Sequence, residues 1–597
     1  MKNKCMHTFH IPVMGLAYTI DSPIRVAHLG ISSVISVMDD ELIERMNQFY
    51  TQQFKLPYQE ITNKIEDFRA KRITAYLNTV DTIVKQKCQE LKNSFIQSNK
   101  AIENFIASLP NVSTLKTELQ YYLDKKLATN HLKNIFEEYF QPGSIDVNIM
   151  TKVDREHYKA NKALPSIYND AHAALRGFAN SNLQASVVLS AGMNPKLFSY
   201  FEEFSCFYPD EKNYLEKKII LKVSDYRSAL IQGQQLAKKG LWVSEYRIES
   251  GLNCGGHAFA TDGQLLGVIL ESFKEKREEL LQTTHQLLCK ALEAKHKPVP
   301  CEPLNLQITA QGGVGTAQEH DFLLNYYKMD AVGWGSPFLL VPEATSTDLA
   351  IRNLLAHARE EDLYLSDISP LGVPFNTVKG TTNEFFKQKR IIKGNPGSAC
   401  PRKYLALDKT FSTEGTCTAS RKHQKLALQQ LETSIQTLSL HDYANKFEKI
   451  VEKSCLCIGL ANASYLDLGL EIKGEQQGVV ICPGPNIAYF TKEASLQEMI
   501  DHIYGRIDLI ETTQRPHFFI KELSMYIDHF EKEQQAYRID PSTIKFKKLQ
   551  KLKENLLDGI EYYEKLFNES MPYFTNEKAQ IYNKLLDYKL FLADQIN

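Results

Sequence analysis

The segment ESGLNCGGHAF, residues 249–259, places reactive side chains beside glycines that leave the backbone free to bend. Cys254 could act as a nucleophile, and His257 as its base or as a proton donor to a substrate. Glu249 precedes them as a further acid or base candidate, and Gly-rich loops commonly carry such chemistry. The Cys and His pair also fits two other interpretations: two ligands of a metal ion, or a buried thiol beside a hydrogen-bonded histidine.

Two glycine-rich turns further along the chain, QGGVGT at 311–316 and GWGSPF at 333–338, have the residue types of a phosphate site. Glycine lets the backbone approach a ligand closely, and amide N–H groups ahead of a helix can cradle a phosphate. The candidate phosphate-binding residues are Gly312, Gly313, Gly315, Thr316, Gly335 and Ser336. Plain glycine turns are the alternative interpretation. The GGVGT turn lacks the rest of a dinucleotide fingerprint, so a Rossmann site for NAD is not expected.

Five cysteines fall between residues 396 and 490, each beside small or turn-forming residues. Thiolates in such positions suit zinc or an iron–sulfur cluster. The predicted ligand set is Cys400, Cys417, Cys457 and Cys482, with Cys455 as an alternative to Cys457. None of the spacings is a CxxC, so scattered structural thiols are the other interpretation.

The elements that must position these motifs are apolar runs that end in Gly, Ser, Asn or Asp and precede helix-like patterns. Strands that alternate with helices pair in parallel, and eight such units predict an α/β fold of the closed (β/α)8 type, a TIM barrel. The predicted strands are 9–17, 31–37, 145–152, 185–192, 218–224, 243–250, 304–313 and 330–336. The segments 249–259, 311–316 and 333–338 then follow strands 6, 7 and 8, where barrel enzymes carry catalytic loops and a frequent phosphate site.

The other segments are arranged around this predicted barrel. Residues 1–40 and 142–395 are assigned to the barrel, and residues 41–141, with apolar side chains at helical spacing, to a long helical insertion after strand 2. That insertion is either an embellishment or oligomer contact, or a lid over the active site. Residues 396–494 are assigned to a cysteine-rich module and 495–597 to a helical C-terminal cap.

The overall composition argues against several classes of protein. The 70 basic and 71 acidic residues give a net charge of −1, which argues against a general nucleic-acid binder and against membrane adsorption by global charge. No apolar run approaches the roughly 20 residues of a spanning helix, and the N-terminus resembles a cleavable signal peptide only weakly. The 11 cysteines, an odd number, argue against a disulfide scaffold. We therefore expect a cytoplasmic protein that acts on a small molecule.

Residues 308–339, ITAQGGVGTAQEHDFLLNYYKMDAVGWGSPFL, resemble the last two strands of the FMN-dependent phosphate-binding barrels. That group includes nitronate monooxygenase, IMP dehydrogenase and the synthase domain of glutamate synthase. The opening, IPVMGLAYTIDSPIRVAHLGISSVIS at 11–36, is similar to their first βαβ unit. The resemblance implies an FMN whose phosphate sits at 312–316 and 335–336 and whose ring lies near Gly15.

A flavin needs a cation or dipole near the N1–C2 edge of its ring. Lys222, in KVSDYR at the end of strand 5, is the preferred candidate, and Lys152 at the end of strand 3 is the other. The alternative for Lys222 is a pair with a barrel carboxylate such as Glu245 or Glu249. Asn194, in SAGMNP, either bonds an edge of the ring or serves the chemistry of its turn.

The first hypothesis is therefore an FMN-dependent oxidoreductase with Cys254, His257, Lys222 and Glu249 as catalytic candidates. Glutamate synthase also carries cysteines after its barrel, at tighter spacing, and this similarity favours an iron–sulfur centre. An electron-transfer partner is a further expectation for such an oxidoreductase. A second hypothesis is a flavin-free barrel that acts on a phosphorylated metabolite by acid–base or cysteine chemistry. A third is a non-catalytic scaffold, which the polar loops at the strand ends disfavour.

Overall fold

The computed structural model of the chain describes residues 6–159, 162–190, 192–472, 478–510, 515–569, 573–575 and 577–595. Its centre is a closed barrel of eight parallel strands, so the predicted (β/α)8 fold is confirmed. The barrel strands, in order around the ring, are β1 (Phe9–Ile11), β2 (Ser32–Ser36), β3 (Ile145–Ile149), β6 (Ser186–Leu189), β7 (Lys218–Val223), β8 (Val243–Glu249), β9 (Gln307–Gln311) and β10 (Ala331–Gly333). Each of them lies within one of the predicted runs.

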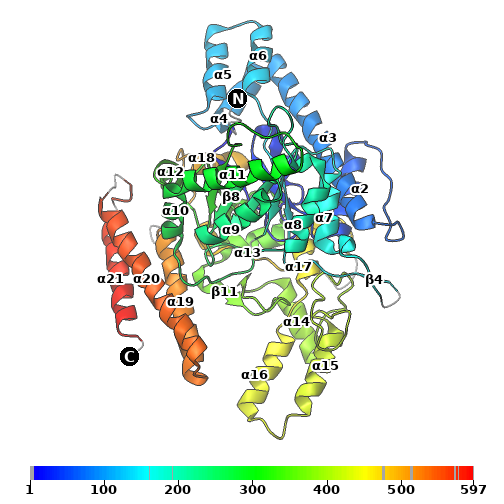
Figure 1. The fold of residues 1–597 in the computed structure, drawn as a ribbon, viewed down its shortest axis with the longest axis vertical. Helices are drawn as coiled ribbons and strands as arrows, with labels where there is room; N and C mark the ends of the chain where they lie inside the picture. Colours follow the sequence, from blue (N-terminus) through cyan, green and yellow to red (C-terminus); the bar gives the residue numbers. More distant parts are fainter. Residues whose placement is uncertain are drawn as a thin grey trace.

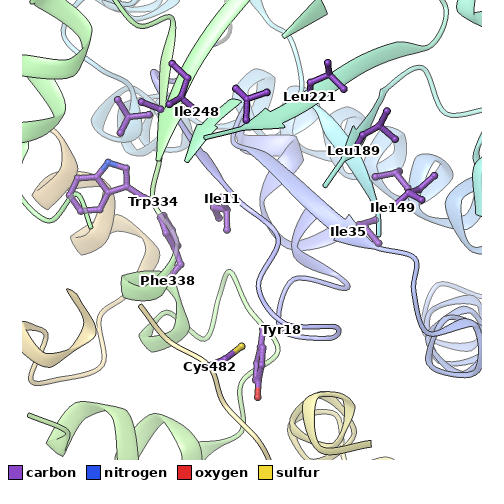
Figure 2. Packing of buried hydrophobic residues seen from close by; sticks show 14 of the residues in the cluster. Ile11, Tyr18, Ile35, Ile149, Leu189, Leu221, Ile248, Trp334, Phe338 and Cys482 are labelled. Atoms are coloured by element: carbon purple, nitrogen blue, oxygen red, sulfur yellow. The ribbon is translucent and has the colours of Figure 1, made fainter. Parts of the chain in front are cut away.

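Side chains on the barrel strands alternate between two environments, as the pleat of a strand requires. On β3, Ile145, Val147 and Ile149 belong to the large hydrophobic core under the helices, and Asp146 and Asn148 lie between them. Figure 2 shows other members of that core on neighbouring strands, among them Ile35, Leu189, Leu221 and Ile248.

Charged side chains meet inside the barrel. Arg247 donates to Glu245 at 2.8 Å and pairs with Asp146 at 3.3 Å, and all three are buried. Arg247 therefore pairs with Glu245 on its own strand and with Asp146 on β3, while Glu249 pairs with Lys222.

Helices surround the barrel in the alternating order that the sequence predicts. After β1 comes the short α1 (Ser22–Val26), and after β2 comes α2 (Asp40–Gln53). The helices that follow the later strands are α7 (Asp170–Ala179), α8 (Pro195–Tyr200), α9 (Tyr226–Ala237), α10 (Leu266–Glu275), α11 (Arg277–Ala294), α12 (Ala317–Asn325) and α13 (Leu349–His357). A small antiparallel pair, β4 (Tyr158–Lys159) and β5 (Lys162–Ala163), lies outside the barrel sheet.

The long segment between β2 and β3 has two parts. The first half of α3 (Phe68–Gln97) packs on α2 and α7, and its Ile73, Tyr76 and Val80 join the main core. The end of α3 forms a second hydrophobic core with α4 (Asn99–Ser108), α5 (Thr114–Lys125) and α6 (Thr129–Tyr139). These helices extend from one end of the molecule (Figure 1).

The chain after the barrel contributes further helices on other sides (Figure 1). A hairpin of β11 (Leu363–Ser366) and β12 (Phe375–Val378) leads to α14 (Thr382–Ile392), α15 (Arg421–Glu432), α16 (Leu440–Val451), α17 (Leu456–Asp467) and α18 (Leu496–Ile503). The last helices, α19 (Phe518–Ile539), α20 (Thr543–Glu569) and α21 (Lys578–Ala593), pack against one another, and α19 and α20 contact α10. Among the helices described, none is both long and apolar enough to cross a membrane.

The segment around residue 400 is fastened to the barrel by buried charges. Arg402 pairs with Asp39, and the Tyr404 hydroxyl donates to Asp40 Oδ1 at 3.0 Å. Asp40 also accepts from Arg69 at 2.8 Å. The cysteine-rich segment is therefore packed directly against the barrel.

Candidate functional site

A cavity of about 460 Å³ opens at the carboxyl ends of the barrel strands, a volume typical of small-molecule sites. The barrel strands and the loops after them supply many of its polar residues, which include Asn148, Lys222, Glu249, Ser250, Asn253 and Gln311. Segments after the barrel supply many of its apolar residues, which include Leu371, Val373, Phe375, Leu405, Leu456, Leu460 and Ile481. Among the described residues, none of the insertion 41–141 lines the cavity, so the chain after the barrel covers it instead.

Lys222 and Glu249 form an ion pair at the barrel mouth, with 3.2 Å between Lys222 Nζ and Glu249 Oε2. Gln311 Nε2 donates to the same carboxylate oxygen at 3.0 Å. All three residues line the cavity. The structure thus shows the pairing of Lys222 with Glu249 and places the lysine cation beside the cavity.

The loop after β8 is held from two sides. From β12, Asn376 Nδ2 donates to the carbonyl oxygens of Cys254 at 2.8 Å and Gly256 at 3.2 Å. From the other side, Asn253 Nδ2 donates to the Phe518 carbonyl at the start of α19, at 3.2 Å. The Gly-rich loop is therefore fixed in place by elements far away in the sequence.

Cys254 and His257 both line the cavity, and burial affects the protonation of each. Burial raises the pKa of the Cys254 thiol well above its ordinary value, so the sulfur is a neutral thiol near pH 7. His257 Nε2 lies 2.7 Å from Ser369 Oγ, and burial lowers the pKa of this imidazole to about 4. Both groups are thus uncharged at neutral pH, which suits contact with a ligand better than thiolate chemistry.

The two glycine turns meet at the cavity. Gly312, Gly313, Gly335 and Ser336 all line it, and Gly312 and Gly313 have φ of 136° and 76°. At Gly313 an added Cβ would lie 2.0 Å from Asn253 Nδ2, so a larger residue would have to displace that side chain.

The amides of Gly315 and Thr316 serve a different partner from the one expected. Both donate to Glu319 Oε2, at 2.8 and 3.3 Å, in a capping box at the start of α12. Arg515 also donates to this carboxylate, from Nη1 to Oε1 at 2.7 Å and from Nη2 to Oε2 at 2.9 Å. A carboxylate of the chain itself thus occupies the anion site at this helix end, so the amides of Gly315 and Thr316 already have a partner.

Gly15 and Asn194 have different positions relative to the cavity. Gly15 lines it with φ of 54°, and an added Cβ would lie 2.7 Å from the Tyr18 ring. Asn194 is not among the lining residues and caps α8, accepting from the Leu197 amide at 3.1 Å. Its amide nitrogen donates to the Thr151 carbonyl at 3.1 Å. The structure therefore shows Asn194 in its turn role.

The four cysteines predicted as metal ligands are split between two places. Cys482 lies beside Tyr18 (Figure 2) and lines the cavity, where burial raises its thiol pKa to about 12 although the Gly256 and Gly15 amides favour the thiolate. Cys400 and Cys417 share a hydrogen bond that holds the pKa of Cys400 below its ordinary value.

Cys457 lines the cavity from the side of Cys400 and Cys417: its thiol shares a hydrogen bond with Cys455 and interacts electrostatically with Cys400 and Cys417. Among the described residues, no group of three or more His, Cys, Asp or Glu side chains is arranged to hold a metal ion. The structure therefore does not support the predicted iron–sulfur or zinc centre.

Several residues of the site were not among the predicted site residues. Asn148 and Asn253 line the cavity, and the Oδ1 atom of each is buried without a hydrogen-bond partner among the described residues. The alternation of Ile145, Val147 and Ile149 on β3 is a signal that places Asn148 on the inner face. Arg515, which precedes α19, and Glu522, on α19, reach the site loops from far along the chain, and neither has a local signal in the sequence.

Comparison with known proteins gives weak structural similarities and no match in sequence. No protein-family model matches the chain, and no curated protein matches its sequence. Among solved structures, FabK from Thermotoga maritima is 10% identical with a TM-score of 0.35, over 88% of this chain and 96% of that one.

A nitroalkane oxidase from Streptomyces ansochromogenes is 8% identical with a TM-score of 0.33, over 84% and 95% of the two chains. The enoyl reductase domain of MlnA from the macrolactin biosynthesis cluster of Bacillus amyloliquefaciens is 15% identical with a TM-score of 0.33, over 63% and 84%. The barrel itself rests on the strand order and not on these similarities.

Proposed function

We propose that the protein is an FMN-dependent oxidoreductase whose flavin binds in the cavity at the barrel mouth. The observation that carries this proposal is the shared lining of one cavity by the glycine turns after β9 and β10 and by the Lys222–Glu249 pair. The sequence resemblance of residues 308–339 to FMN-dependent phosphate-binding barrels supports the same assignment.

The residues present fit a flavin by chemical type. Backbone amides at Gly312, Gly313 and Gly335, with the Ser336 hydroxyl, would hold the phosphate. The unpartnered buried oxygens of Asn148 and Asn253 supply acceptors for ring N–H or ribityl hydroxyl donors.

Lys222 would supply positive charge beside the ring, and the turn at Gly15 would lie against it. When bound, the flavin supplies hydride or electron transfer. These assignments keep Lys222, Gly15, Gly312, Gly313, Gly335 and Ser336 as cofactor residues.

The rest of the cavity suits a small-molecule substrate. Val373, Phe375 and Leu405 supply apolar walls that exclude water from reacting groups. Cys254 and His257, both uncharged near pH 7, would contact the substrate, and Glu249 would hold Lys222 in place. We expect an electron donor to reach the same cavity.

The experiment that tests this function is the absorption spectrum of anaerobically purified protein, with flavin, iron, sulfide and zinc analysis of the same sample. An oxidised-flavin spectrum with FMN released on denaturation supports the proposal. A colourless protein that also fails to take up added FMN contradicts it and favours a barrel that acts on a phosphorylated metabolite. The same sample also tests the metal centre. Iron or zinc that is present in wild type and lost in both Cys400→Ala and Cys482→Ala would establish this centre, which the arrangement of the cysteines does not support.

A further inference from the structure

A buried carboxyl lies directly behind the loop that follows β8. Glu522, on α19, is only 1% exposed. Its Oε1 accepts from the Ser250 hydroxyl at 2.5 Å, and its Oε2 accepts from the Leu266 amide, at the start of α10, at 2.7 Å. Both donors are neutral, so they offset the cost of burying a negative charge only in part.

Ser250 connects this carboxyl to the cavity. It follows the last residue of β8, lines the cavity and is itself buried. Besides donating to Glu522, its Oγ accepts from the Asn253 amide at 3.0 Å. A hydroxyl has one donor and two acceptor sites, so Ser250 Oγ has one acceptor site left while Glu522 is ionised.

Protonation of Glu522 changes which way this hydrogen bond runs. The carboxyl O–H can then donate to the free acceptor site of Ser250 Oγ, which releases the serine hydroxyl proton from its bond to Glu522. The hydroxyl can rotate toward the cavity without leaving a buried group unpaired. The same two side chains therefore have a second arrangement in which a proton points at a bound ligand.

We propose that Glu522 and Ser250 form a proton relay into the cavity. Ser250 gives its hydroxyl proton to an anion on the substrate, and the O–H bond of Glu522 breaks as its proton restores the serine hydroxyl. The product gains one proton and Glu522 is left as a carboxylate, which solvent reprotonates. The relay rests on the proposed function for its substrate, whereas the two hydrogen-bond arrangements belong to the chain itself.

Among the titratable groups at this place, Glu522 is the one that changes charge near pH 7. Burial raises the pKa of Glu522 to about 7, near the pH at which an acid works best. The titratable groups that face it are Cys254 in the loop, Tyr526 on α19 and Tyr563 on α20, and burial raises the pKa of each well above 7. These three stay protonated and neutral while Glu522 titrates.

The first test needs no flavin. Difference infrared spectroscopy during a pH titration follows the carbonyl band of protonated carboxyl groups in wild type, Glu522→Gln, Ser250→Ala and Glu531→Gln. Glu531 is an exposed carboxylate on the same helix, so its variant controls for the substitution. Wild type and Glu531→Gln should lose a buried carboxylic-acid band with a midpoint near pH 7, and Glu522→Gln should lack that band.

The Ser250→Ala variant tests the bond between the two side chains. The serine hydroxyl favours the carboxylate, so its removal should move the midpoint of the Glu522 band to higher pH. No band near pH 7 in wild type, or no shift in Ser250→Ala, overturns the proposal.

The second test measures delivery of the proton. Photoreduced FMN-loaded protein is mixed with duroquinone, whose two-electron reduction takes up protons. The rate in wild type and Glu531→Gln should fall as the pH rises through about 7, because the acid form of Glu522 is consumed. Below that pH, Glu522→Gln and Ser250→Ala should be slower by on the order of 100-fold, the usual size of general-acid effects.

Equal rates and an unchanged pH profile in Glu522→Gln overturn the relay. If the protein takes up no flavin, the proposed function has failed, and the infrared midpoint and its shift in Ser250→Ala still decide the relay. The two failures are thus distinguishable.

Discussion

Gly313 shows how tightly single residues are constrained at this site. Its φ of 76° favours glycine, and an added Cβ would lie 2.0 Å from Asn253 Nδ2. Gly394 has φ of 68° and nothing within 4 Å of an added Cβ, so an alanine there would carry similar backbone strain without the clash.

Gly313→Ala should therefore weaken FMN binding and lower stability by more than the roughly 1–2 kcal/mol of strain expected for Gly394→Ala. FMN titration and urea unfolding of both variants measure the difference. Equal effects in the two variants would show that the contact with Asn253 carries no weight.

At the scale of whole elements, the segment that leads into α19 holds the glycine turn after β9 in place. Arg515 bonds both oxygens of Glu319 and also donates to the Gly313 carbonyl at 2.7 Å. Glu319 is 1% exposed, so removal of its partner leaves a buried charge.

Arg515→Met should therefore cost about 3–5 kcal/mol of unfolding free energy and weaken FMN binding as well. The matched control is Arg277→Met, which breaks a half-exposed pair with Asp330 and should cost no more than about 1 kcal/mol. Urea unfolding measures both. A cost in Arg515→Met as small as that of Arg277→Met would mean that the pair does not hold the turn.

The elements differ in how far their sequence reveals them. The barrel strands are predictable because alternation on β3 and glycines at strand ends are local signals, and each strand pairs with the next one along the ring. The capping box of Thr316 and Glu319 is equally local. The role of α19 and of the segment before it is not predictable, because Glu522 and Arg515 reach loops that lie about 200 or more positions earlier in the chain. For the same reason the sequence could not separate Cys482 from Cys400 and Cys417.

Buried neutral histidines link the stability of the whole molecule to pH. Burial lowers the pKa of His7 and His517 to about 4 and that of His320 to about 3. In the unfolded chain a histidine takes up a proton below about pH 6.5, whereas these stay neutral in the fold. The unfolded state therefore binds more protons between pH 6.5 and 4, and stability falls as the pH drops through that window.

Each such histidine should contribute a loss of up to about 1.4 kcal/mol per pH unit, so several kcal/mol should disappear between pH 6.5 and 5. Urea unfolding at a series of pH values measures this slope. His7→Gln should flatten it relative to the exposed control His131→Gln. Identical slopes in the two variants would contradict the linkage for His7.

The central claim is that the cavity at the barrel mouth binds FMN through its phosphate. Titration of flavin-free protein with FMN and with riboflavin, followed by flavin fluorescence, tests it most directly. The account predicts saturable binding of one FMN per chain and clearly weaker binding of riboflavin, which lacks the phosphate that the turns at Gly313 and Gly335 would hold. No saturable binding of FMN, or equal affinity for both flavins, would contradict it.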